Sequence, residues 1–375
     1  MAADALPPAR ARAGGPGPSL IEQAVGQLSP AYFGMVMATG IVSIAAHWVG
    51  FTILANALFL LNIVAYVVLV VLNIVRLLAC RHALVADLLD HQRGPGFFTA
   101  VAASCLLGSQ FILLAGALRP AVALWTIAIL LWVTLTYTIF TAFTVKEHKP
   151  SLDAGLSGAW LLAVVATQAI AVLAALIAES WEQPFRIEAN FFALSMWLFG
   201  GMLYIWMISL IFYRYTFFPL APGDLSPPYW INMGAMAISA LAGSLLIINA
   251  PHAPFLLSLL PFLKGYTVLY WASGTWWIPM LAALFTWRHG YRRFPLHYDP
   301  LYWGAVFPLG MYAVATFRLI EALQLTFLST VPGAFFAIAL AAWALAFIGT
   351  VRSIWRHTIG LARMAREVRQ PRNPR

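Results

Sequence analysis

Long stretches without charge alternate with short charged segments along this chain. No Lys, Arg, Asp or Glu occurs at residues 23–75, 120–145, 225–263 or 322–351. A helix needs about 20 apolar residues to cross the hydrocarbon core of a bilayer. Most of the uncharged stretches therefore fit one membrane-spanning helix each, and the first is long enough for two.

This pattern predicts ten membrane-spanning helices. Their expected bounds are 30–49, 53–77, 96–117, 121–145, 155–178, 189–213, 228–249, 265–287, 301–322 and 332–354. The segment from Pro251 to Leu263 is too short for a further span, and we interpret it as an outer loop or a half-inserted segment. The predicted fold class is all-α integral membrane.

Composition supports this interpretation. Hydrophobic residues make up 62% of the chain and charged residues 9%, with a mean hydropathy of +0.82. A water-soluble domain carries charge at about a quarter of its positions, so no soluble domain is expected. We predict a disordered cytoplasmic N-terminus over 1–27, a ten-helix domain over 28–355 and a basic cytoplasmic tail over 356–375.

The basic residues predict the orientation. With ten spans, 18 of the 22 lysines and arginines fall on the face that holds both termini, and the other four are Arg119, Arg186, Lys264 and Arg318. Cytoplasmic loops are enriched in Lys and Arg, so we expect a multi-pass protein of the cell inner membrane with both termini in the cytoplasm. The net charge of +9 is then an orienting signal, and no nucleic-acid partner is expected.

Residues suited to catalysis or to a cofactor are scarce at membrane depth. The eight histidines fall at predicted helix ends or in loops, where they do not form the facing pairs that a membrane haem requires. No glycine-rich phosphate-binding motif is present in the sequence. We therefore predict no cofactor, no metal site and no enzymatic activity.

Ionisable residues inside a membrane usually mark a transport path, but here they lie only near helix ends. Lys264 and Arg318 fall at the outer ends of the eighth and ninth spans. We interpret them as an outer-mouth charge that attracts anions; the alternative is that they reach the lipid headgroups. The uncharged interior favours a passive, channel-like path over a proton-coupled one.

Small and polar residues of the odd-numbered spans are the candidate pore lining. They are Gly34, Thr39, Gly40, Gly108, Gly158, Thr167, Gln168, Gly234, Gly243, Gly304 and Gly310. Missing side chains leave room for a lumen, and uncharged donors could solvate an anion without trapping it. The alternative is that the glycines permit close helix packing and that the polar groups form interhelical hydrogen bonds.

Several motifs resemble one known family. The first span reads SPAYFGMVMATGIVSIA from Ser29 to Ala45, and the ninth reads YWGAVFPLGMYAVAT from Tyr302 to Thr316. Three further matching stretches lie at 90–110, 149–173 and 227–243. Together they resemble the tellurite-resistance and dicarboxylate transporter family, which includes TehA, the yeast malate permeases and sulfite exporters, and the plant guard-cell slow anion channels. Ala38 stands where the family commonly has glycine.

The resemblance implies five helical hairpins, with the odd helices as an inner pore ring, the even helices as an outer ring, and assembly as a homotrimer. It also implies that Phe307, just before Pro308, is the pore gate. The expected function is passage of small anions or organic acids across the lipid bilayer through a gated central pore.

Two other functions stay open at this stage. The first is a proton-coupled carrier or exporter of C4-dicarboxylate, sulfite or tellurite, with Asp153, Glu188 or Glu321 as titrating groups. The second is a membrane enzyme or a structural membrane protein. The sequence does not identify the transported ion.

Overall fold

The structure is a computed structural model that describes residues 25–181, 183 and 185–369. In this part of the chain ten helices are long and apolar enough to cross a membrane, and no strand is present. They are α2 (Phe33–Val49), α3 (Thr52–Ala79), α5 (Phe98–Ala115), α6 (Leu118–Val145), α8 (Leu162–Ser180), α9 (Phe185–Phe217), α10 (Ile231–Asn249), α12 (Leu260–Thr286), α13 (Trp303–Leu323) and α14 (Thr330–Arg369). The all-helical prediction of ten spans is confirmed.

The ten helices form two concentric rings. In an 18-residue stretch of each span, all residues of α8 and 94% of those of α10 are buried, against 22% in α3 and 17% in α6. The inner ring closes because α2 packs against α5, α5 against α8, α8 against α10, α10 against α13, and α13 against α2. Each inner helix also packs against the outer helix that follows it, so the predicted five hairpins and the inner and outer rings are confirmed.

Local signals in the sequence set the ends of the inner helices. The side chain of Ser29 accepts a hydrogen bond from the backbone N–H of Ala31, and Pro30 occupies the first turn of the segment that leads into α2. Gly50 ends α2 at φ 97°, and Gly116 ends α5 at φ 60°. Glycine adopts this left-handed conformation without steric cost, so both helices stop where the chain must turn back.

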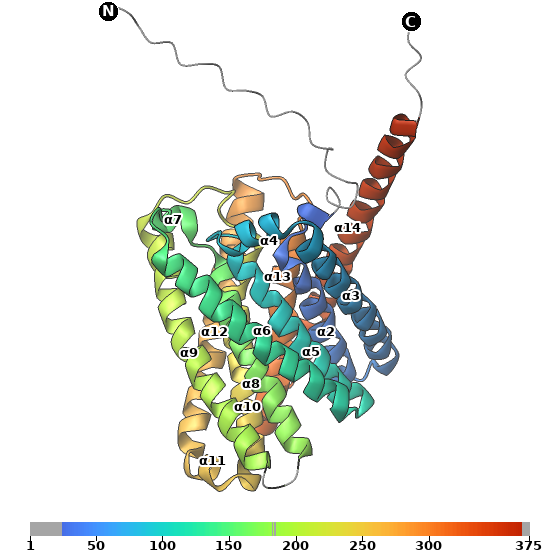
Figure 1. Ribbon diagram of the computed structural model, residues 1–375. Helices are drawn as coiled ribbons and strands as arrows, with labels where there is room; N and C mark the ends of the chain where they lie inside the picture. The colour runs from blue at the N-terminus through green and yellow to red at the C-terminus, as the bar shows by residue number, and fades with distance from the viewer. Residues whose placement is uncertain (1–24, 182, 184, 370–375) are drawn as a thin grey trace, which may run out of the picture.

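The two ends of the bundle are distinct (Figure 1). The short helices α4 (Arg81–Leu88) and α7 (Leu152–Gly155) lie at one end, from which the last turns of α14 also project. We call this the α4–α7 end. At the opposite end lies α11 (Pro254–Ser258), so the segment interpreted as an outer loop contains a short helix. We call this the α11 end.

The predicted terminal segments fall largely outside the described residues, which begin at Val25. Helix α14 runs on to Arg369 and so passes the predicted domain boundary at 355. The division of the chain into an N-terminal segment, a ten-helix domain and a tail stays a prediction.

The polar contacts that connect the two rings include one at each of five equivalent places. Each place joins an outer helix to the inner helix of the next hairpin: Trp343–Thr39 (2.9 Å), Tyr66–Ser104 (2.8 Å), Trp132–Thr167 (2.8 Å), Trp197 to the carbonyl of Ser239 (2.8 Å) and Trp271–Thr316 (2.9 Å). Buried polar groups need such partners because leaving them unpaired is costly. The inner-ring groups at these five places thus face the outer ring.

Candidate functional site

The candidate site is the axis of the inner ring, which begins at the α4–α7 end. Here each inner helix is preceded by a single 3-10 turn: η1 (Pro30–Tyr32), η2 (Gly94–Phe97), η3 (Gly158–Leu161), η4 (Pro227–Trp230) and η7 (Pro300–Tyr302). These turns contact one another in sequence, and η7 contacts η1, so they also close a ring. Because all five inner helices begin at this end, their positive dipole ends gather around the axis of the ring, where they favour an anion.

A cavity lies on the axis toward the α11 end. All five inner helices line it, with Ile41, Ile44, Trp48, Leu106, Ser109, Leu113, Val172, Leu176, Leu241, Leu245, Val314 and Arg318. Its volume is about 10 Å³, which is close to the space needed for one water molecule. The surface that lines the cavity is entirely apolar: the hydroxyl of Ser109 donates to the carbonyl of Cys105, and Arg318 borders the cavity with the apolar part of its side chain. The lumen in this conformation is therefore narrow and almost dry.

Arg318 is the one charged residue among the described residues that line this cavity. Its Nη1 donates to Oε2 of Glu321 over 2.7 Å, and its guanidinium carbon lies 4.6 Å from the centre of the Trp48 ring. Trp48 in turn stacks on Phe317, with ring centroids 4.9 Å apart. An Arg–Glu ion pair therefore lies beside the cavity at its α11 end.

Phe307 lies on the same face of α13 as the lumen-lining residues. Phe307, Met311, Val314 and Arg318 follow one another at intervals of four, three and four residues, which places them in one stripe along a helix. Val314 and Arg318 line the cavity, and Phe307 and Met311 are completely buried.

The neighbours of Phe307 give the same direction. Pro308 faces Gly234 of α10, while Gly310 faces Ile41 of α2. Helix α13 packs between α10 and α2. The side chain of Phe307 lies between these two contacts, on the stripe that carries Val314, and therefore points toward the axis of the inner ring. Phe307 precedes Val314 by about 10 Å along the helix, on the side of the α4–α7 end.

The predicted glycines all face neighbouring elements. A methyl group at Gly158 would lie 2.5 Å from the carbonyl oxygen of Pro228, and one at Gly234 would lie 2.7 Å from Pro308. The other candidates meet the following neighbours: Gly34 faces Trp303, Gly40 faces Asn62 and Gln110, Gly108 faces Leu173, Gly243 faces Thr267 and Trp197, Gly304 faces Pro228, and Gly310 faces Ile41. These contacts are the ones that the packing alternative requires. A pore-lining role for the glycines stays a prediction.

The predicted polar lining residues contact the outer ring. Thr39 accepts from Trp343, Thr167 accepts from Trp132, and Gln168 donates to the carbonyl of Trp197 over 3.0 Å. Lys264 is exposed on α12, so the structure places the two predicted outer-mouth charges apart: Arg318 in the inner ring and Lys264 on the outer ring.

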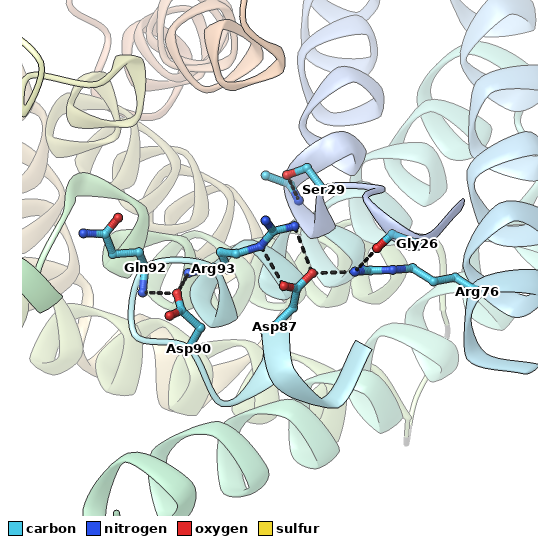
Figure 2. A network of polar contacts seen from close by, with 8 residues as sticks. Gly26, Ser29, Arg76, Asp87, Asp90, Gln92 and Arg93 are labelled. Atoms are coloured by element: carbon cyan, nitrogen blue, oxygen red, sulfur yellow. Dashed lines mark hydrogen bonds and ion pairs between the residues drawn. The ribbon is translucent and has the colours of Figure 1, made fainter. Parts of the chain in front are cut away.

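Sequence analysis did not single out a buried ion pair at the α4–α7 end (Figure 2). Nη2 of Arg76 on α3 contacts Oδ2 of Asp87 on α4 over 2.5 Å and donates to the carbonyl of Gly26. Arg93 contacts the same carboxylate over 2.8 Å. This network ties the segment before α2 to the loop before α5, which brings together two of the five turns around the opening.

The fold and the cavity define a class: a multi-pass membrane protein whose inner ring of parallel helices surrounds a narrow cavity. The sequence profile of the SLAC1 family, described as "Voltage-dependent anion channel", matches residues 27–351. The chain belongs to this family, whose members are channels and transporters of anions and not enzymes. The resemblance to the tellurite-resistance and dicarboxylate transporters is thereby confirmed.

Proteins of a bacterium, an archaeon and a fungus are similar to this chain. An uncharacterized membrane protein of Mycobacterium tuberculosis is 39% identical over 152 residues, which cover 40% of this chain and 77% of the relative. An uncharacterized transporter of Methanocaldococcus jannaschii is 23% identical and covers 87% of this chain and 93% of its own length. The sulfite efflux pump SSU1 of Trichophyton rubrum is 25% identical, with 88% and 91% covered.

Proposed function

We propose that small anions cross the membrane along the axis of the inner ring and that Phe307 is the gate that closes this path. The observation that carries the proposal is the closed ring of five inner helices around an apolar cavity, beside which Arg318 lies. Five helix N-termini at one opening and Arg318 near the other favour negative over positive ions at both ends.

Closure by Phe307 follows from the physics of a narrow apolar lumen. A hydrated ion needs continuous water, and a constriction lined by aromatic and aliphatic side chains excludes it. Phe307 is 1% exposed and lies on the stripe that carries Val314 and Arg318. Rotation of this ring, or its removal, would join the cavity to the opening at the α4–α7 end.

Anion flux into liposomes containing purified protein tests the gate. We expect Phe307→Ala to raise chloride and nitrate flux by about tenfold or more, because a constriction that excludes water is removed. Phe212→Ala is the matched control, since Phe212 is 44% exposed on the outer helix α9, and this variant should conduct like the wild type. Unchanged flux in correctly folded Phe307→Ala would overturn the gate.

Coupled export is the second candidate function, because the similar fungal proteins are named sulfite efflux pumps. The proposed titrating groups Asp153, Glu188 and Glu321 lie away from the middle of the lumen. The hydrogen bond from Ser151 holds the pKa of Asp153 below its usual value, so this carboxyl is ionised at neutral pH. Sulfite, malate or tellurite flux that follows an imposed proton gradient would favour the carrier over the channel.

Orientation and assembly belong to the same proposal. We place the α4–α7 end in the cytoplasm, because Arg76, Arg93, Lys146 and Arg214 lie at this end and cytoplasmic loops are rich in such residues. The α11 end then faces outward in the inner membrane, and both chain termini are cytoplasmic. The homotrimer implied by the family resemblance is tested by light scattering of the purified protein, for which a monomer mass would count against it.

A further inference from the structure

We infer that Arg318 forms a binding site for small oxyanions at the α11 end of the lumen and that Glu321 is a built-in competitor which occupies part of this site when no anion is bound. The inference rests on the proposed conduction path and names a specificity-determining residue within it. Its ligand class is an anion with two oxygens in one plane, such as a carboxylate or nitrate.

The guanidinium has an unused binding edge. Glu321 accepts from Nη1 alone, and the buried Nε has no acceptor among the described residues. Nε and Nη2 point to the same side of a guanidinium and form a fork that matches two oxygens of a carboxylate or nitrate. The side chain is 13% exposed and its apolar stem borders the cavity, so an anion that arrives from the α11 end can reach the guanidinium.

The surroundings hold the guanidinium in place. The ring of Trp48 lies against one face at 4.6 Å and is itself stacked on Phe317. A guanidinium over an aromatic face keeps its charge and remains free to donate in its own plane. A planar donor held in this way distinguishes an oxyanion, which can accept two parallel hydrogen bonds, from a halide, which has no such geometry.

Glu321 completes the site as a competitor. Its carboxylate is 47% exposed and three residues from Arg318, so it can swing into solvent at little cost. When it pairs with Arg318 it lowers the positive charge that an incoming anion experiences. Removing the carboxylate while keeping a side chain of the same shape should therefore strengthen anion binding.

Equilibrium binding of formate and chloride to the purified protein in detergent tests the site without requiring transport. Formate is the probe because it carries two oxygens, and binding is followed by the shift in unfolding temperature. We expect Arg318→Lys to weaken formate binding on the order of tenfold, the scale of one charge-assisted hydrogen bond, with a smaller effect on chloride. Glu321→Gln should tighten the binding of both anions.

Arg119→Gln is the matched control, since it removes a positive charge at the same end from an exposed position at the start of the outer helix α6. This variant should bind formate like the wild type. Equal formate binding by the wild type and Arg318→Lys, or equal losses in Arg318→Lys and Arg119→Gln, would overturn the site. If Phe307→Ala shows no anion flux but formate binding still depends on Arg318, the conduction path is refuted and the binding site is not.

Discussion

The indole Nε1 of Trp343 on α14 donates a hydrogen bond to Oγ1 of Thr39 on α2, and the two residues are 304 positions apart in the chain. This contact joins the last outer helix to the first inner helix. Four other contacts, from α3 to α5, α6 to α8, α9 to α10 and α12 to α13, repeat the same connection around the bundle. The Trp343–Thr39 bond makes this connection between the last hairpin and the first, and so completes the ring.

A double-mutant cycle measures this closure. We expect Thr39→Val and Trp343→Phe to be coupled by about 1 kcal/mol in the free energy of unfolding, because each change removes one partner of a buried hydrogen bond. Denaturation of the protein in detergent micelles provides the measurement. Trp355 is 69% exposed, so Trp355→Phe should show no coupling to Thr39→Val. Equal coupling in both cycles would show that the bond does not connect the rings.

Two predicted pore glycines contact the same proline in different ways. A methyl group at Gly158 would press on the carbonyl of Pro228, whereas one at Gly304 would lie at an ordinary 3.5 Å from the same residue. Gly158→Ala should therefore lower the free energy of unfolding by about 2 kcal/mol through overpacking, while Gly304→Ala should be neutral or stabilising. Equal unfolding free energies for the two variants would contradict the packing role of Gly158.

The Arg76–Asp87 pair allows a test of the opening at the α4–α7 end. Asp87→Asn should lower the free energy of unfolding by about 3 kcal/mol, because it leaves the guanidinium of Arg76 buried without a counter-charge. Arg81→Gln removes an exposed charge at the same end and should change the unfolding free energy by less than about 0.5 kcal/mol. Similar stabilities of the two variants would contradict a structural role for the pair.

The lowered pKa of His91 predicts how the stability of the protein depends on pH. Burial, followed by the charge of Lys146, lowers the pKa of His91 below its usual 6.5, so the unfolded chain binds the proton more tightly than the folded one. Stability should fall as the pH drops from 6.5 through the lowered pKa of the folded state. His91 stacks on Phe143 with ring centroids 4.1 Å apart, and His91→Phe should keep this contact while reducing the loss of stability.

Unfolding temperatures measured from pH 7 to pH 5 would check this prediction. His148→Gln, which removes an exposed histidine at the same end, should retain the pH dependence of the wild type. An unchanged slope in His91→Phe would mean that other groups cause the acid sensitivity.

The spans could be predicted from the sequence because charge-free stretches of sufficient length are rare outside membranes. Their ends were less certain: the sixth span was expected at 189–213, and α9 runs from Phe185 to Phe217. The directions of Thr39, Thr167 and Gln168 could not be predicted. A helix that is buried on all sides, as α8 is, has no polar face to show which side meets the axis.

The contacts of the charged residues could not be predicted from the sequence either. From the sequence, Arg76 indicates only the orientation of the chain in the membrane. Its partner Asp87 lies on a separate short helix, which the pattern of spans does not predict. The position of Arg318 at a helix end was evident, but its place in the lumen depends on the rotation of α13. That rotation is set by the packing of Pro308 against Gly234 and of Gly310 against Ile41.

Chemical modification of the lumen tests the central claim most directly. Val314 lines the cavity and is 1% exposed, while Leu345 on the outer helix α14 is 73% exposed. A cysteine is placed at either position in a chain that also carries Phe307→Ala and lacks the native Cys80 and Cys105. Liposome flux is then measured before and after treatment with a negatively charged methanethiosulfonate.

If anions cross along the axis of the inner ring, the reagent should reach Val314→Cys and reduce its anion flux to the wild-type level, while Leu345→Cys keeps its flux. Mass spectrometry shows whether the cysteine of Val314→Cys has been modified. If it is modified and the anion flux is still undiminished, the anions cross elsewhere and the account is contradicted.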